Sequence, residues 1–184
     1  MPELRTIILD GQVYSDGGAS AVQELGYVLA TAITYIRELQ KRGLEINTIA
    51  KQMQFTFSLG AMFFMEIAKL RAARQLWSKV VESFGGDKEA QKMIIHACTA
   101  NFNKTVYDPY VNMLRTTTEA FSAVVGGIDS LEVQPFDSAI RLGDEFSRRI
   151  ARNTQIMLQN ECNLCQPVDP AGGSWYIESL TKQV

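Results

Sequence analysis

The chain has few of the residues that mark several large protein classes. It holds three cysteines and one histidine in 184 residues, and this odd, small number of thiols does not suggest the framework of a disulfide-rich secreted domain. No apolar run approaches the ~20 residues of a membrane-spanning helix, and the first residues lack the pattern of a secretory signal. Lysines and arginines are scattered, with a net charge of −2, which does not favour nucleic acid as a partner. We therefore expect a soluble, cytoplasmic protein without a membrane or nucleic-acid partner.

A short apolar strand followed by an amphipathic helix occurs four times along the chain. The expected strands are Arg5–Asp10, Gln54–Ser58, Met93–Cys98 and Ser130–Gln134. Their starts lie roughly 50, 40 and 35 residues apart, a spacing typical of parallel β-α crossovers. Eight such units close a barrel whose active site lies at the carboxyl ends of its strands. The sequence therefore predicts an α/β fold with about four β/α units, half of a TIM (β/α)8 barrel.

The expected helices have recognisable start and stop signals. Ser20 and Gln23 make a capping box, and Gly43 ends the helix that follows. A second helix is expected up to the paired glycines that follow Phe84. Asp108 is expected to cap a third helix with Pro109 in its first turn. The apolar faces of the third and fourth helices are predicted to carry Val111, Leu114, Phe121, Val125, Phe146, Ile150 and Met157.

The end of the chain is different. Residues 162–174 are rich in turn-forming residues, and the chain becomes apolar again from Trp175. We therefore expect residues 1–166 to form the half-barrel and residues 167–184 to leave it. Four parallel strands leave two edges with unpaired backbone groups, which natural proteins cover. Either further chain covers them or, as we expect for the isolated chain, two copies associate into an eight-stranded ring.

Residue chemistry by itself defines no site. Cys162 and Cys165 have the only metal-like or redox-like spacing, but a structural zinc needs four ligands and a redox pair follows a strand. We interpret them as two incidental thiols. His96 lies inside an apolar strand, facing either the barrel or the helices, and no partners for a nucleophilic triad are evident. We interpret it as a core or pocket-lining histidine.

Two other groups of residues are candidate sites. Gly17 and Gly18 precede a helix start, where backbone N–H groups can bind phosphate. They lack both the G-x-G-x-x-G and the Walker pattern, so an ordinary turn is favoured. Asp10, Asp16 and Asp137 lie near strand ends as candidate acids or bases, but their spacing fixes no pair.

Four stretches of the sequence carry a resemblance to a known family: Gly18–Tyr27 (GASAVQELGY), Phe63–Leu76 (FFMEIAKLRAARQL), Ser147–Gln155 (SRRIARNTQ) and Asp169–Thr181 (DPAGGSWYIESLT). They strongly resemble the methylmalonyl-CoA mutase family of cobalamin-dependent acyl-CoA mutases, and the resemblance runs from residue 5 to the end. It implies a substrate-binding (β/α)8 barrel around the coenzyme A chain, with this chain as its second half. It also implies a separate cobalamin-binding domain and a radical rearrangement of methylmalonyl-CoA to succinyl-CoA, with adenosylcobalamin supplying the radical.

The same resemblance implies site residues that this chain has replaced. Active members carry a Tyr-His pair after the first of these strands, and its histidine hydrogen-bonds the substrate thioester. Gln12 and Val13 occupy those positions here, and valine cannot donate a hydrogen bond. An arginine that contacts coenzyme A in the family falls on Gln52, where a charged hydrogen bond worth roughly 1.5–3 kcal/mol is lost.

Further departures follow the third and fourth strands. His96 matches a family histidine, but the glutamine that faces the corrin becomes Cys98. An asparagine and a glutamate near the adenosyl group fall on Gln134 and Ser138. We therefore expect no catalytic, metal-binding or cofactor-binding residue in this chain. His96 and Gln134 are expected to line a vestigial substrate pocket.

A retained framework with replaced site residues favours the small, non-catalytic subunit of a heterodimeric mutase. Its partner would be a homologous catalytic chain that carries adenosylcobalamin, while this chain binds no cofactor. One alternative is an active mutase of altered substrate range, in which Val13, Cys98 and Ser138 reshape the pocket. A second alternative is a half-barrel binding module unrelated to coenzyme A. Bulky side chains that fill the barrel axis would favour this alternative.

Overall fold

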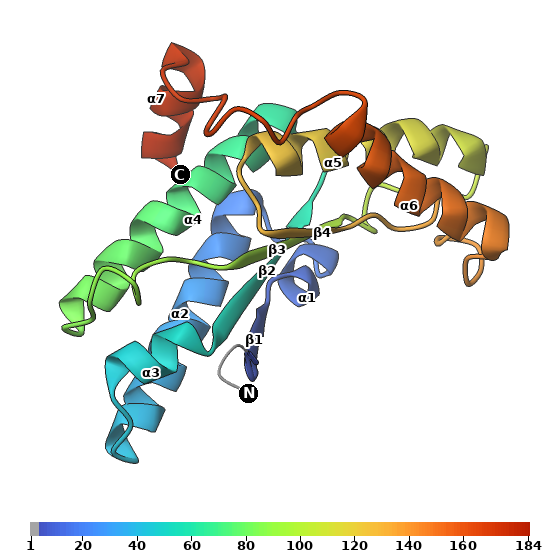
Figure 1. The fold of residues 1–184 in the computed structure, drawn as a ribbon. Coiled ribbons are helices and arrows are strands. Elements are labelled where there is room, and N and C mark those ends of the chain that lie inside the picture. Colours follow the sequence, from blue (N-terminus) through green and yellow to red (C-terminus); the bar gives the residue numbers. More distant parts are fainter. Residues whose placement is uncertain (1–3) are drawn as a thin grey trace.

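The centre of the molecule is one four-stranded sheet (Figure 1). The computed structural model describes residues 4–184. Its strands are β1 (Ile7–Asp10), β2 (Met53–Leu59), β3 (Ile95–Thr99) and β4 (Ser130–Glu132). All three pairings are parallel, and the order in space is the order in the chain, as in consecutive units of a β/α barrel. The predicted α/β fold with four parallel strands is confirmed, and the strand ends differ from the predicted ones by at most two residues.

Helices connect the strands. Their bounds are α1 (Gln12–Asp16), α2 (Ala21–Lys41), α3 (Ile46–Lys51), α4 (Phe63–Ser83), the 3-10 turn η1 (Pro109–Val111), α5 (Asn112–Val125), α6 (Glu145–Asn160) and α7 (Trp175–Gln183). The predicted capping box is confirmed, because Gln23 N donates to Ser20 Oγ at 3.3 Å and Ser20 N donates to Gln23 Oε1 at 2.9 Å. Gly43 follows the end of α2 with φ +86°. The short helices α1 and α3 were not predicted.

The prediction for the start of the third helix is only partly confirmed, because Asp108 holds the N-cap position with Pro109 directly after it, but it precedes a 3-10 turn and not the α-helix itself. Asp108 has φ +50°, and its side chain makes no capping hydrogen bond. Pro109 opens the 3-10 turn η1, and α5 begins only at Asn112. Pro109 lacks a backbone N–H and has a fixed φ, both of which suit the first position of such a turn.

The prediction for the apolar face of α5 was also partly wrong, since Leu114 is 69% exposed and Phe121 is 38% exposed. Polar residues of α5 face the interior instead. The side chain of Asn112 donates to the carbonyl oxygens of Phe136 and Thr105, both at 2.9 Å. These bonds orient the helix, because buried carbonyl groups need donors.

The main core lies between the sheet and the helices α2 and α4. Alternate strand residues face these helices and are buried: Leu9, Met53, Phe55, Phe57, Leu59, Ile95 and Ala97. Phe55 packs edge-on against Trp77 of α4, with 4.7 Å between ring centroids. Burying each large apolar side chain contributes roughly 1.5–3 kcal/mol, so this layer holds α4 on the sheet.

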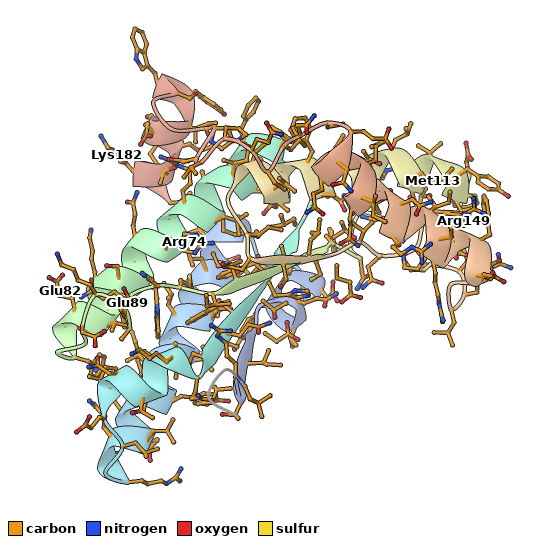
Figure 2. All side chains as sticks on the ribbon, in the orientation of Figure 1. Arg74, Glu82, Glu89, Met113, Arg149 and Lys182 are labelled. Atoms are coloured by element: carbon orange, nitrogen blue, oxygen red, sulfur yellow. The ribbon has the colours of Figure 1, made fainter. Side chains whose placement is uncertain are left out.

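Two arginines of α4 attach later parts of the chain to it. Arg74, labelled in Figure 2, donates to the carbonyl oxygen of Met93 at 2.5 Å and to that of Gly127. Arg71 pairs with Asp169 in the turn-rich stretch and with Glu178 of α7 at 2.6 Å. Figure 1 shows α7 beside α4. None of the helices in residues 4–184 has both the length and the apolar character that a bilayer crossing requires.

Candidate functional site

The strands present a polar face away from α2 and α4, which we call the inner face. Strand residues alternate between two faces, and paired residues of a parallel sheet share a face. The register therefore places one row across all four strands, Asp10, Thr56, His96 and Ser130. The next row toward the carboxyl ends contains Ser58, Cys98 and Glu132. TIM barrels usually fill this space with bulky branched residues, whereas these two rows carry small or polar side chains, and Ile8 is the bulky branched residue that β1 adds to the same face.

His96 lies on the inner face, which settles which of the two faces it occupies. Its Nδ1 is 2.8 Å from Ser130 Oγ, and its Nε2 is 3.9 Å from Glu132 Oε2. The latter distance is too long for a hydrogen bond. Because the imidazole is 24% exposed, Nε2 can hydrogen-bond a polar group that enters along this face. Sequence reasoning missed Ser130 and Glu132; their i, i+2 spacing on one strand was the available signal.

Gln134 stands just beyond the end of β4. Its backbone N–H donates to Thr99 Oγ1 at 2.9 Å, and its side-chain Nε2 donates to Glu132 Oε1 at 3.0 Å. Glu132 thus lies between the two predicted pocket residues, since its other carboxylate oxygen approaches His96. Gln134 and Ser138 line a cavity of about 610 Å³ at this end of the sheet, and His96 does not. The structure therefore places the two residues on one polar surface but not in one pocket.

The three candidate aspartates do not come together as an acid/base pair. Asp10 Oδ1 accepts from the backbone N–H of Gln12 at 2.9 Å, and Asp16 Oδ2 accepts from Asn101 Nδ2 at 3.3 Å. Asp137 is buried after β4 and accepts from Arg141 Nε at 2.8 Å. Each carboxylate accepts a hydrogen bond from a loop or from the start of a helix, and its role is therefore structural.

The remaining motif candidates have ordinary surroundings. Gly18 has φ +91° in the turn before α2, a conformation that glycine adopts at little cost. Cys162 and Cys165 are exposed and not disulfide-bonded. Within residues 4–184, no three His, Cys, Asp or Glu side chains gather into a group that could hold a metal ion.

A buried ion network beneath the carboxyl ends of β1 and β2 was missed by sequence reasoning. Lys69 Nζ lies 2.6 Å from Glu24 Oε2, 2.7 Å from Glu66 Oε2 and 2.6 Å from the carbonyl oxygen of Ser58. Burial raises the pKa of Glu24. Burial alone would lower the pKa of Lys69, but Glu66 and Glu24 outweigh it, so that pKa is raised. Burial is thus the main cause of the shift at Glu24, with a small contribution from Glu66, whereas the two carboxylates are the cause of the shift at Lys69. The i, i+3 spacing of Glu66 and Lys69 was the only local signal.

A second buried pair supports the loop after β3. Lys104 Nζ lies 2.8 Å and 2.7 Å from the two carboxylate oxygens of Glu119, and both side chains are 1% exposed. Burial lowers the pKa of Lys104 and raises that of Glu119. Glu119 also accepts from Asn103 Nδ2 at 2.6 Å. Polar anchors therefore hold the loops at the carboxyl ends, where barrel enzymes place their sites.

Comparison with known proteins identifies the family. A family model described as methylmalonyl-CoA mutase matches residues 1–184. The chain belongs to the methylmalonyl-CoA mutase family. It is 44% identical to the methylmalonyl-CoA mutase small subunit of Porphyromonas gingivalis, 47% identical to the small subunit of Streptomyces virginiae and 45% identical to the methylmalonyl-CoA mutase of Escherichia coli. Each alignment covers all of this chain but only 26–30% of the relative. The resemblance seen in the sequence is thus confirmed.

Two of the positions at which the resemblance expects other residues are Val13 and Cys98. Val13 lies in α1 directly after β1 and is 68% exposed. Cys98 is buried on β3, with its Sγ 3.6 Å from the carbonyl oxygen of Phe57. Burial, with smaller contributions from the carboxylates of Glu132 and Asp10, raises the pKa of the Cys98 thiol to about 12. The thiol is therefore protonated at neutral pH and is a poor nucleophile or metal ligand.

Proposed function

We propose that this chain is part of a non-catalytic small subunit of a methylmalonyl-CoA mutase, which supports a homologous catalytic chain that isomerises methylmalonyl-CoA to succinyl-CoA. The observation that carries the proposal is the chemistry at the carboxyl ends of β1 and β3. Val13 offers no hydrogen-bond donor where the resemblance expects a histidine, and Cys98 carries a buried, protonated thiol where it expects an amide. Neither residue stabilises developing charge on a thioester. Two of the relatives named above are small subunits.

We further propose that adenosylcobalamin resides in the partner chain and not in this one. His96 is the only histidine, and its Nδ1 is hydrogen-bonded to Ser130 on the inner face. An imidazole held inside a strand is badly placed to reach a cobalt ion. The thiol of Cys98 is no substitute, because its pKa of about 12 leaves it protonated. The residues of this half-barrel therefore supply no ligand for the cobalt ion of a corrin.

The partner of this subunit is proposed to be a homologous mutase chain. A relative from Porphyromonas gingivalis is named a large subunit, alongside the small subunit from the same organism, which supports a heteromeric assembly. For the isolated chain we propose self-association, because β1 and β4 each have only one partner strand within residues 4–184. Three thiols without a disulfide support a reducing compartment, and we assign the protein to the cytoplasm.

The alternative of an active mutase with altered substrate range has one observation in its favour. Small and polar residues such as Thr56 and Ser58 occupy the two rows nearest the carboxyl ends of the strands on the inner face, as a barrel that admits an extended thioester requires. The same observation disfavours a binding module unrelated to coenzyme A.

Turnover measurements distinguish these functions. The full-length protein is purified alone and together with the larger homologous mutase chain, and conversion of methylmalonyl-CoA to succinyl-CoA is measured with adenosylcobalamin. We expect no turnover by the protein alone and a stable complex with a cobalamin-carrying chain. Turnover by the protein alone would establish the active mutase, and failure to co-purify with the larger chain would remove the proposed subunit role.

A further inference from the structure

A row of aromatic rings crosses the three helices α5, α4 and α7. Phe121 of α5 packs against Phe63 of α4, with 5.5 Å between the ring centroids. Phe63 packs against Phe64 at 5.3 Å, and Phe64 packs against Tyr176 of α7 at 5.4 Å. Trp175 directly precedes Tyr176 at the start of α7. We call Phe64, Phe121, Trp175 and Tyr176 the aromatic patch.

The aromatic patch is exposed over a large area. Trp175 is 92% exposed and Tyr176 61%, while Phe64 is 50% and Phe121 is 38% exposed. At roughly 200 Å² for one large aromatic side chain, these fractions amount to roughly 500 Å² of apolar surface. A single exposed hydrophobic residue is normal, but a contiguous patch of this size is at the upper end of what monomers carry and usually marks an interaction site.

Helix α5 extends the patch with further apolar surface. Leu114 lies seven residues before Phe121, on the same side of the helix, and is 69% exposed. Thr118 lies between them, and its hydroxyl donates to the carbonyl oxygens of Leu114 at 3.2 Å and of Arg115 at 2.9 Å within the helix. Because this hydroxyl already has acceptors, covering the face costs little in desolvation. The sequence spacing thus marks an apolar face that the fold leaves uncovered.

The charge beside the patch is already neutralised within the chain. Arg71 lies two turns after Phe64 on α4 and is only 12% exposed. It pairs with Asp169 and, at 2.6 Å, with Glu178 of α7. The centres of protein interfaces are likewise depleted of free charge and enriched in aromatic residues. The patch therefore fits an apolar protein surface and not a charged ligand.

The size of the patch matches the requirement of a stable complex. A standard interface covers about 800 Å² on each partner, and roughly 55–65% of that area is nonpolar. The exposed aromatic surface of roughly 500 Å² equals this nonpolar share. Tryptophan and tyrosine are also the residues that most often dominate binding energy, and the patch contains one of each in Trp175 and Tyr176.

We propose that the aromatic patch binds the homologous mutase chain. This inference rests on the proposed function, which gives the chain such a partner. The large-subunit relative named above aligns with all of this chain, so a partner of that kind has counterparts of α4, α5 and α7. It can place an equivalent face on the patch, as in the twofold dimers that predominate among oligomers. The patch lies on helices and leaves the edges of β1 and β4 free for further strands.

The affinity of the full-length protein for the larger homologous mutase chain, measured by calorimetry, tests the proposal. Trp175→Lys and Leu114→Lys are each expected to weaken binding at least tenfold, because each places an unpaired charge in an apolar contact. Trp175→Phe keeps an aromatic ring and is expected to stay within threefold of the parent protein. Both residues are largely exposed, so the fold is expected to be kept, and circular dichroism with thermal unfolding checks this.

Leu44→Lys is the matched control. Leu44 is 46% exposed between α2 and α3, and Figure 1 shows that loop at the opposite end of the molecule from α7. Its affinity is expected to stay within twofold of that of the parent protein. An equal loss in Leu44→Lys and Leu114→Lys would overturn the proposal.

Three further outcomes separate this inference from the proposed function. Binding that is unchanged in both Trp175→Lys and Leu114→Lys would overturn the patch as the interface and leave the subunit role standing. Absence of binding by the parent protein would remove the subunit role and this inference together. If Trp175→Lys abolishes only the association of two copies of this chain, the patch serves a second copy and the proposed partner is wrong.

Discussion

Lys69 Nζ lies 2.6 Å from Glu24 Oε2, although the two residues are 45 positions apart in the chain and their side chains are 1% and 2% exposed. This contact joins α4 to α2. The second carboxylate oxygen of Glu24 accepts from the backbone N–H of Ser58 at 2.8 Å, and the carbonyl oxygen of Ser58 accepts from Lys69. Both helices are therefore fixed to the carboxyl end of β2, which sets the position of the loops around the inner face.

Replacing Lys69 by methionine tests how strongly the fold depends on this network. The change leaves the carboxylates of Glu24 and Glu66 buried without their cation. We expect a loss of about 3–5 kcal/mol in the free energy of unfolding, the usual cost of breaking a buried ion pair on one side. Urea denaturation followed by circular dichroism measures it.

Lys92→Met is the matched control for this experiment. Lys92 also pairs with a glutamate three residues earlier at 2.7 Å, but Lys92 and Glu89 are 65% and 66% exposed. An exposed pair contributes little, so the expected change is below about 1 kcal/mol. Equal losses in the two variants would show that burial does not decide the strength of these pairs.

The pH dependence of stability provides a second test of the network. The pKa of Glu24 is raised above its ordinary value of 4.5 in the folded protein, so the folded state binds more protons than the unfolded state between these two pKa values. The stability that this group contributes is present below pH 4.5 and is lost as pH rises through the folded pKa. Lys69, whose pKa is raised above 10.5, contributes stability that is lost only in strong alkali.

Glu24→Gln is therefore expected to change the slope of stability against pH as well as the stability itself. Unfolding free energies measured from pH 4.5 to 8 should fall less steeply with rising pH in the variant than in the parent protein, because the residue that releases the proton is absent. The substitution also removes the negative charge that pairs with Lys69, which lowers the stability at every pH. The slope of stability against pH is therefore the decisive quantity. Parallel curves for the two proteins would count against a raised pKa of Glu24 in the folded protein.

The sequence allowed the parts of this fold that depend on local pattern to be predicted. The capping box needs only Ser20 and Gln23, and the apolar run around Ile95 identifies a buried strand wherever its partners lie. The orientation of α5 depended on a distant residue, because Glu119 faces inward to meet Lys104 in the preceding loop. Leu114, which looks like a core residue by spacing, is left on the surface.

For the candidate site too, the sequence predicts single residues but not the contacts between distant ones. His96 stands out in the sequence as the single histidine, but a strand that is apolar on both sides does not reveal which face a residue takes. Ser130, its hydrogen-bond partner, lies 34 positions further along the chain, and only the register of β3 with β4 brings the two together. The cavity beside Gln134 depends on where α6 lies relative to the chain after β4, which no local signal encodes.

Gly11 is predicted to tolerate no side chain. A Cβ built on it would lie 2.7 Å from Glu24 Oε1 and 2.7 Å from the carbonyl oxygen of Thr56, and the second of these atoms is backbone that cannot move aside. Gly11→Ala is therefore expected to destabilise the protein by about 1–3 kcal/mol, as overpacking usually does. Thermal and urea unfolding both report this change.

Gly26→Ala serves as the comparison, because a Cβ at Gly26 meets no atom within 4 Å and the residue lies inside α2. Alanine is the better helix former, so this variant is expected to gain about 0.5–1 kcal/mol. The two substitutions add the same methyl group with opposite expected signs. A Gly11→Ala variant as stable as Gly26→Ala would mean that β1 and α2 do not approach as closely as described.

Thiol reactivity tests the surroundings of the three cysteines. With the pKa of Cys98 at about 12, only about one molecule in ten thousand carries its thiolate at pH 8, and the thiolate is the reactive form. Cys162 and Cys165 are exposed and are expected to react with iodoacetamide within minutes. Peptide mapping by mass spectrometry after timed quenching follows each residue separately, and Cys98 is expected to react only in denaturant. Cys98→Ala should leave the fast reaction unchanged, whereas rapid modification of Cys98 in the native protein would mean that the inner face near β3 is open to solvent.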